Sequence, residues 1–293
     1  MEPSKHPITA IIIYRNEEHL LTDCLEALHF CDEIITIDMS SEDHSRTIAE
    51  KYSDRMFYAM PYPIAEPTRV EAAKLAKNDW IFFVDPDEII PPKLAEDIVS
   101  AIYKISNAGI IQIPIRFYFK RFILNGTVWG TPTFVSKIAN RKRANILPLC
   151  NRLMETKKEY NTIKIQHKPN NHMIHLWSDS YQDLCYKHFI RYPRLEAKAK
   201  VIRGETFTLF RGFIEPFKEL KICLKDFDGW RLGLRGFALS FIYFVYTIIS
   251  IWFMLYYQYC VKPNNNQIHE NIPPLREINY FKNNSSLHES TAA

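Results

Sequence analysis

Residues 78–92 read NDWIFFVDPDEIIPP. Five apolar residues form a run that is typical of a strand buried on both faces. The run leads directly into three carboxylates, Asp85, Asp87 and Glu88, and two prolines follow that favour the start of a helix. Because close carboxylates repel one another, keeping three of them at one strand end requires a physical cause.

The segments around this stretch alternate between strand-like and helix-like patterns. Strand-like segments occur at 8–14, 32–40, 55–59, 80–84 and 109–115, and the first of them is a continuous run of mostly β-branched residues. Helical patterns separate them, which predicts βαβ units and a mostly parallel sheet. In such sheets ligands bind beyond the carboxyl ends of the strands. The sequence therefore predicts an α/β fold with a binding crevice at that edge.

Polar residues gather at three of these strand ends. In chain order they are Asn16, Glu17, Asp38, Asp85 and Asp87. Hard divalent cations prefer oxygen ligands, and Mg²⁺ in particular bridges one or two carboxylates to substrate phosphates. The acids therefore predict a Mg²⁺ or Mn²⁺ site beside a diphosphate. The alternative is that Asp87 or Glu88 only caps the following helix, which would explain one acid but not the pair.

The C-terminal third combines a basic segment with a long apolar one. Residues 187–235 contain 12 Lys and Arg against 6 Asp and Glu, and residues 236–261 carry no charge. Residues 237–257 have the length and composition of a membrane helix. A basic block beside such a segment favours an anionic membrane surface, with the basic side in the cytoplasm. A buried core helix is the alternative, and spanning and interfacial placements both stay open.

The remaining composition excludes several classes of function. A net charge of +4 is too small to indicate nucleic-acid binding. The six cysteines show no CxxC pair and no metal-ligand spacing, which indicates reduced thiols and a cytoplasmic location of the soluble part. Neither GxGxxG nor GxxxxGK[ST] occurs, so dinucleotide-binding and P-loop readings lack support.

Several stretches resemble family 2 glycosyltransferases with the GT-A fold. They are AIIIYRNEEHLLTDCLEAL, CDEIITIDMSSEDHSRTIAEKY and RVEAAKLAKNDWIFFVDPDEIIPPKL, in this order. Two later stretches, YKHFIRYPRLEAKAK and EPFKELKICLKDFDGWRLGLRGF, are similar to bacterial lipopolysaccharide core glucosyltransferases of the WaaE/KdtX type. The resemblance covers about residues 8–115 and 174–245, and it implies sugar transfer with inversion from a nucleotide sugar.

The resemblance also implies roles for individual residues. Substrate binding falls to residues that match motif positions, namely Tyr14, Asn16, Glu17, Asp38, Arg69 and His175. Among these, Asp38 matches the aspartate that binds the base or ribose, and Arg69 an arginine near the diphosphate. Asp85 and Asp87 match the catalytic DxD acids that hold the metal, with Asp87 the more direct ligand.

The chain departs from the family where the general base is expected. The R-L-F stretch and the His-Glu pair of the relatives have no counterpart in residues 135–160, which read VSKIANRKRANILPLCNRLMETKKEY. Glu155 is the candidate base in this region. Asp179, His172 and His175 are alternatives, and for each of them a structural or surface role competes with the catalytic one.

Together these observations predict three regions. Residues 1–200 form a GT-A glycosyltransferase domain, residues 201–262 a basic and apolar membrane-associated region, and residues 263–293 a polar, disordered tail. The predicted activity is that of a hexosyltransferase which moves sugar from a UDP-hexose to a lipid-linked acceptor of lipopolysaccharide or another envelope glycan, at the cytoplasmic face of the inner membrane. Transfer to a polyprenyl phosphate and a non-catalytic membrane scaffold of the same fold are the alternatives.

Overall fold

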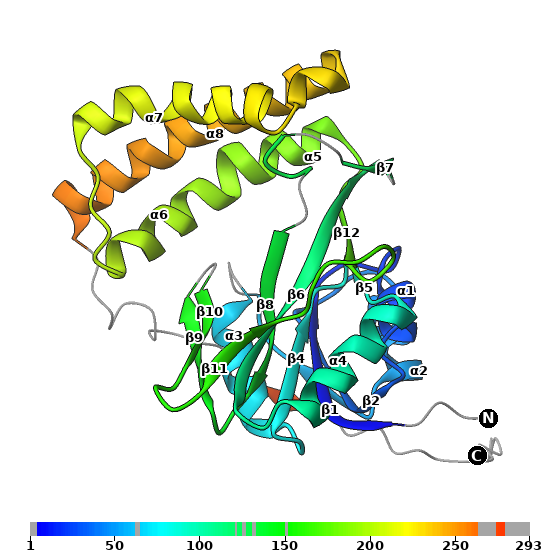
Figure 1. Cartoon of the computed structure of the whole chain (residues 1–293). Coiled ribbons are helices and arrows are strands. Elements are labelled where there is room, and N and C mark those ends of the chain that lie inside the picture. Colours follow the sequence, from blue (N-terminus) through cyan, green and yellow to red (C-terminus); the bar gives the residue numbers. More distant parts are fainter. Residues whose placement is uncertain are drawn as a thin grey trace, which may run out of the picture.

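A mixed β-sheet forms the core of the protein (Figure 1). The computed structural model describes residues 5–61, 65–120, 122–124, 127–130, 133–149, 152–262 and 274–278. The strand order is β13-β3-β2-β1-β4-β8-β6-β12-β5, with β7 and β11 also paired to β6 and β9 paired to β10. The strands are β1 (His6–Tyr14), β2 (Cys31–Asp38), β3 (Arg55–Tyr58), β4 (Trp80–Val84), β5 (Glu88–Ile89), β6 (Ala108–Phe119), β7 (Phe122–Ile123), β8 (Thr133–Asn140), β9 (Ala144–Leu149), β10 (Arg152–Thr156), β11 (Asn161–Lys164), β12 (Met173–Ser178) and β13 (Arg276–Glu277).

Helices cover both faces of the sheet and one of its ends. Around the sheet lie α1 (Leu21–Glu26), α2 (Ser45–Tyr52), α3 (Glu66–Leu75) and α4 (Pro92–Lys104). Beyond one end lie α5 (Tyr181–Tyr186), α6 (Tyr192–Ile202), α7 (Leu209–Lys221) and α8 (Leu234–Tyr256), with short helical turns η1 (Lys187–Arg191), η2 (Ile222–Asp226), η3 (Gly229–Leu232) and η4 (Tyr257–Val261). Figure 1 shows these C-terminal helices as a separate layer above the sheet.

The parallel half of the sheet matches the prediction from the sequence. β3, β2, β1 and β4 lie side by side and parallel, and residues 8–14 of β1 are buried throughout. Ile8, Ala10 and Ile12 pack toward α1 and α4, whereas Ile11 and Ile13 pack toward α3. Both faces of β1 therefore need apolar side chains, which explains its continuous β-branched run.

The other half of the sheet differs from the predicted parallel arrangement. β8 lies antiparallel between β4 and β6, so the two apolar strands of the sequence do not meet directly. β8 carries polar Ser136, Lys137 and Asn140 and shows no clean alternation of apolar residues. Its position is set by long-range pairing and by Lys137, which finds its partners only in the folded chain.

The C-terminal helix is the one segment, within the described residues, that passes a length-and-composition test for a membrane span. Residues Leu234–Val261 have a mean hydropathy of 2.0 in their most apolar window, and 33% of that window is buried within the protein. The buried side packs on α6 and α7. The buried share of this helix is smaller than expected for a core helix and larger than expected for an isolated membrane helix.

The predicted disorder of residues 263–293 needs correction where the structure describes this tail. Residues 274–278 return to the sheet, and β13 pairs antiparallel with β3. Leu275 and Ile278 pack against the two sides of the core, and Glu277 lies 3.0 Å from Arg55. These contacts are long-range, and a local reading of polar composition misses them.

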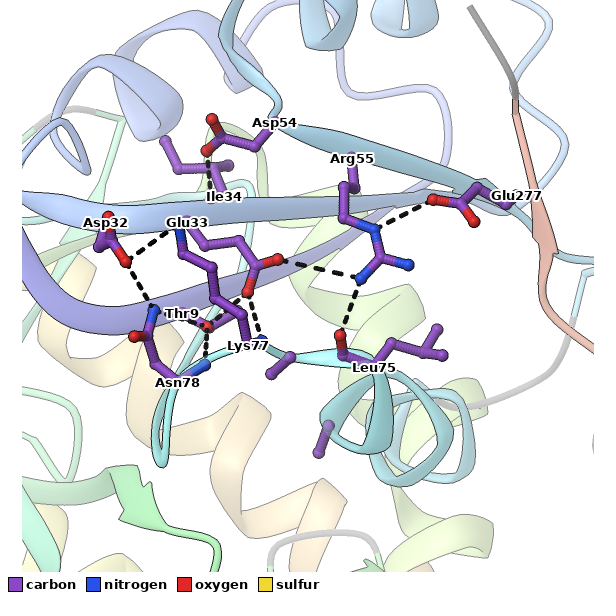
Figure 2. A network of polar contacts seen from close by, with 12 residues as sticks. Thr9, Asp32, Glu33, Ile34, Asp54, Arg55, Leu75, Lys77, Asn78 and Glu277 are labelled. Atoms are coloured by element: carbon purple, nitrogen blue, oxygen red, sulfur yellow. Dashed lines mark hydrogen bonds and ion pairs between the residues drawn. The ribbon is translucent and has the colours of Figure 1, made fainter.

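A polar network fixes the strands at the edge opposite their carboxyl ends (Figure 2). The carboxylate of Glu33, 3% exposed, accepts hydrogen bonds from the Thr9 hydroxyl at 2.7 Å and from the Lys77 backbone N–H at 2.8 Å. Arg55 lies 3.9 Å from its other oxygen and also donates to the Leu75 carbonyl at 2.8 Å. Glu33 thus joins β1, β2, β3 and the loop before β4.

We expect Glu33→Ala to lower the free energy of unfolding by roughly 3 kcal/mol, because it leaves the donors of Thr9 and Lys77 buried without an acceptor. Glu159→Ala, at an exposed turn, is the control and should change it by less than about 0.5 kcal/mol. Urea denaturation of both variants measures the effect. Equal losses in the two proteins would contradict the role of Glu33.

Candidate active site

A cavity of about 1080 Å³ opens between the carboxyl edge of the sheet and the C-terminal helices. From the sheet side it is lined by residues that include Tyr14, Glu17, Arg69, Asp85, Asp87, Lys137 and His175. From the helix side it is lined by residues that include Lys187, His188, Arg191, Glu196, Tyr243 and Tyr246. The cavity lies where the sequence predicts the binding crevice.

Two buried cations hold Asp85 and Glu88 together. Asp85 pairs through one oxygen with the Arg69 guanidinium and through the other with Lys137 Nζ at 2.7 Å. Lys137 Nζ also lies 2.8 Å from Glu88 Oε1, and Glu88 Oε2 accepts the Asp85 backbone N–H at 2.9 Å. Lys137, whose side chain is only 11% exposed, bridges the two acids. This ion cluster explains how Asp85 and Glu88 can lie close together despite their like charges.

The third acid, Asp87, is positioned by β12. That strand pairs with β5, with His175 opposite Glu88, and the Leu176 N–H donates to the Asp87 carbonyl at 2.8 Å. His175 Nε2 lies 3.1 Å from Asp87 Oδ2. Backbone and side-chain contacts from one strand therefore fix where the Asp87 carboxylate points.

The protonation of this cluster follows from burial and charge. Burial raises the pKa of Asp85, but Arg69 and Lys137 outweigh it and hold that pKa well below its usual range. Burial raises the pKa of Glu88 above its usual value, with Lys137 opposing the shift. Burial alone would lower the pKa of His175, yet the charge and hydrogen bond of Asp87 raise it. The result is a charged Asp85 and a His175 whose pKa lies above its usual value.

The acids fit a divalent cation in a specific way. Both Asp85 oxygens are taken by cations, whereas only Oδ2 of Asp87 is hydrogen-bonded to another residue that the structure describes. Within the described residues no group of three or more His, Cys, Asp or Glu forms a metal cage. Mg²⁺ often needs only one or two carboxylates, completed by waters and substrate phosphates. Asp87 fits such a ligand, and Asp85 instead orients Arg69 and Lys137.

The other predicted binding residues fall into two groups. Tyr14 and Glu17 line the cavity, as do Arg69 and His175. Asp38 is the sheet partner of Tyr14 and is buried, with Oδ1 accepting the Ser41 N–H at 2.8 Å. Asn16 has a positive φ of 56° and accepts the Glu42 N–H at 2.8 Å, so it ties two loops together beside the cavity.

The candidate general bases do not gather at this cavity. Met154 lines it, but its neighbour Glu155 on β10 is not among the lining residues. Asp179 is exposed outside it, and His172 lies 3.4 Å from the Tyr118 hydroxyl. Of the four candidates, His175 alone lines the cavity, and its bond to Asp87 gives it a positioning role.

Lys137 is a site residue that sequence reasoning missed. Its signal is weak, a single lysine in VSKIA between apolar residues that form a strand. Lys187 and Arg191 were also not singled out. They reach the cavity from η1, a π-helical turn, and such irregular turns occur often at functional sites.

Parallel βαβ units that end in carboxylates at a large crevice define an α/β fold of the GT-A type. Residues 9–157, about half of the chain, match the sequence profile "Glycosyl transferase family 2", and the protein belongs to this family. The predicted fold class and the predicted enzyme class, a glycosyltransferase, are thereby confirmed.

Individual relatives match smaller parts of the chain. The lipopolysaccharide core biosynthesis glycosyltransferase LpsC of Rhizobium meliloti (strain 1021) is 31% identical over 96 residues, 31% of this chain and 36% of LpsC. The chain thus matches about a third of that relative, which bears out the resemblance to lipopolysaccharide core transferases.

Solved structures show weaker likeness. Glucosyl-3-phosphoglycerate synthase from Mycobacterium tuberculosis, in complex with Mn²⁺, UDP and glucosyl-3-phosphoglycerate, has a TM-score of 0.30 and 18% identity over 38% of this chain and 43% of that one. Mannosyl-3-phosphoglycerate synthase from Rubrobacter xylanophilus has a TM-score of 0.31 and 15% identity over 39% and 40%. Scores this low carry no weight for function.

Lys137→Met should lower the free energy of unfolding by about 3–5 kcal/mol, because it leaves Asp85 and Glu88 without their shared buried cation. Lys142→Met is the matched control: Lys142 also bonds an acid, Asp79, at 2.7 Å, but its side chain is 72% exposed. That pair should contribute at most about 1 kcal/mol. Chemical denaturation measures the free energy of unfolding of both variants. Similar losses in the two would contradict the role of Lys137 as the cation shared by Asp85 and Glu88.

Glu17 generates a pH-dependent prediction. Burial, followed by the charge of Asp87, raises its pKa from 4.5 to about 7. An acid with a raised pKa in the folded state contributes its stability at low pH and loses it as pH rises through that pKa. The wild type should therefore lose stability relative to Glu17→Gln between about pH 5 and pH 8.

Denaturation of both proteins in EDTA at the two pH values measures this difference. Groups other than Glu17 titrate alike in the two proteins and cancel. A stability difference that does not change with pH would refute the raised pKa.

Proposed function

We propose that this family 2 enzyme transfers a hexose, with inversion, from a UDP-hexose to a lipid-linked acceptor of lipopolysaccharide core or a related envelope glycan. The observation that carries the proposal is the cluster of Asp85, Asp87 and Arg69 at the carboxyl edge of the sheet, held rigid by Lys137 and His175. The similarity to LpsC, a glycosyltransferase of lipopolysaccharide core biosynthesis, supports the acceptor class.

The donor side is proposed to be built around Arg69 and Asp87. Arg69 is buried, lines the cavity, and has an Nε without a hydrogen-bond partner among the described residues. This N–H suits a diphosphate oxygen. A Mg²⁺ or Mn²⁺ ion held by Asp87 would neutralise charge on the leaving nucleoside diphosphate. Tyr14, Glu17 and Asp38 are proposed to flank the nucleotide.

The acceptor hydroxyl needs a general base within reach of the cavity. Apart from the cluster at residues 85–88, the carboxylates that line the cavity are Glu17, Glu66 and Glu196. Because Glu17 is proposed to flank the nucleotide, Glu66 and Glu196 are better placed for this role than Glu155, which remains a prediction from the sequence alone.

The domain and location follow the same proposal. Residues 1–200 supply the transferase domain, and residues 201–262 associate with the cytoplasmic face of the inner membrane, where a lipid-linked acceptor resides. The long apolar helix and the basic residues before it support this placement.

A donor screen tests the proposal. Purified protein is incubated with UDP-, GDP- and CMP-sugars and Mn²⁺ or Mg²⁺, with and without EDTA. Binding is measured as the shift in melting temperature. One UDP-hexose should stabilise the wild type only when metal is present. Asp87→Ala should lose at least tenfold in metal-dependent affinity, whereas Asp23→Ala, an exposed acid on α1, should bind like the wild type.

The outcomes separate the alternatives. Metal-dependent binding retained by Asp87→Ala would refute the metal site. A stable glycoside as product supports the proposal, whereas an acid-labile phosphodiester indicates a polyprenyl-phosphate transferase. Wild-type protein without binding or turnover for any donor would favour a scaffold.

A further inference from the structure

Helices α7 and α8 together expose an unusually apolar surface. It comprises Phe210, Phe213 and Phe217 of α7 and Phe241, Trp252 and Tyr256 of α8, each between 46% and 76% exposed. We call these six residues the outer face. Figure 1 shows the two helices side by side in the layer above the sheet. Contiguous aromatic surface of this kind marks an interaction site.

The outer face is continuous across the two helices. The ring of Phe217 lies 5.3 Å from that of Phe244, which stacks with Phe241 at 6.2 Å. Farther along, a Cβ at Gly212 would lie 3.2 Å from Ile251, so the glycine allows the helices to approach closely. The hairpin therefore presents one aromatic surface rather than two separate stripes.

Cations border this surface. Arg211, Lys218 and Lys225 recur at seven-residue spacing and are all exposed, which places a basic stripe beside the aromatic residues of α7. Aromatic rings flanked by long basic side chains match the interface of an anionic lipid membrane, where rings enter the acyl boundary and cations meet headgroups.

The inner side of α8 is bound to charged elements over much of its length. Tyr246 of α8 donates a hydrogen bond to Glu196 of α6, and Arg194 of α6 donates to the hydroxyl of Tyr257 in η4, directly after α8, at 3.2 Å. Tyr243 and Tyr246 also line the polar cavity. If α8 crossed a bilayer, these charged α6 residues would be drawn into the hydrocarbon with it, at high cost.

The sheet gives an independent reason. The chain before α8 forms β3, and the chain after α8 forms β13, which is the hydrogen-bonded neighbour of β3. Both ends of α8 therefore belong to one domain on one side of a membrane. A single span would separate β13 from β3, and a non-helical return through the hydrocarbon would leave backbone groups unsatisfied.

From these observations we infer that α7 and α8 lie in the plane of an anionic membrane, with the outer face inserted into one leaflet and neither helix crossing it. The opposite side of α8 lines the cavity, so the cavity stands directly beside the lipid headgroups. The membrane contact stands on the geometry alone. Only the statement that a lipid-linked glycan enters the cavity there rests on the proposed function.

Vesicle flotation tests the membrane contact. The wild type should bind vesicles of phosphatidylcholine with phosphatidylglycerol, and bind pure phosphatidylcholine less. The double variant Phe210→Glu/Phe213→Glu should bind at least tenfold more weakly. Met60→Glu/Tyr103→Glu adds the same charge at exposed apolar residues outside the hairpin and should bind like the wild type.

The inference would be overturned if the wild-type protein did not bind anionic vesicles, or if it only formed oligomers. Equal losses in the two double variants would also overturn it. All four substituted side chains are more than half exposed, so both double variants should fold like the wild type. Circular dichroism of each variant checks this.

Cysteine labelling distinguishes an in-plane hairpin from a span. Asp226→Cys lies before α8 and Glu277→Cys after it, and both positions are exposed. In inverted membrane vesicles of the expressing bacterium, a membrane-impermeant maleimide should label both introduced thiols, read by peptide mass spectrometry. If the maleimide labels only one of the two introduced thiols in these vesicles, and labels the other only from the opposite side of the membrane, α8 spans the membrane. Neither test reads sugar transfer, so its failure leaves the proposed activity standing.

Discussion

The structure depends on the compensation of closely spaced acids by two largely buried cations at the end of β4. Asp85 and Glu88 share Lys137, and Asp85 also holds Arg69, so like charges that would repel become one connected cluster. The contributing residues come from α3, from the position directly after β4, from β5 and from β8, so the cluster forms only when these elements have come together. Assembly of this part of the fold therefore also orders the side chains at the cavity.

The two halves of the sheet have different structural roles. The parallel half supplies a buried, uniform platform, with β1 at its centre and polar loops at its carboxyl edge. The mixed half supplies the groups that orient those loops, with Lys137 from β8 and His175 from β12. The helix layer then closes the space above them. Each part contributes one wall to the same cavity.

What the sequence could predict was set by the range of the interactions. β1 and β4 were predictable because strands buried on both faces require continuous apolar runs, and Pro91 and Pro92 marked the start of α4. The acids and Arg69 were found from strand ends and motif positions. Lys137 was missed because its meaning comes from residues about 50 positions earlier. β13 was missed because its partner, β3, lies more than 200 positions away.

A single helix, α8, has one side against the reaction cavity and the other in the outer face. For an enzyme held in this way, the search for a lipid-borne substrate takes place in two dimensions. The quantity that sets the encounter rate is then the number of acceptor molecules per unit of membrane area, and diluting the membrane with inert lipid slows the enzyme even when the total amount of acceptor is constant. For an enzyme with the proposed membrane contact and lipid-linked acceptor, the rate of glycan assembly depends on the composition of the leaflet.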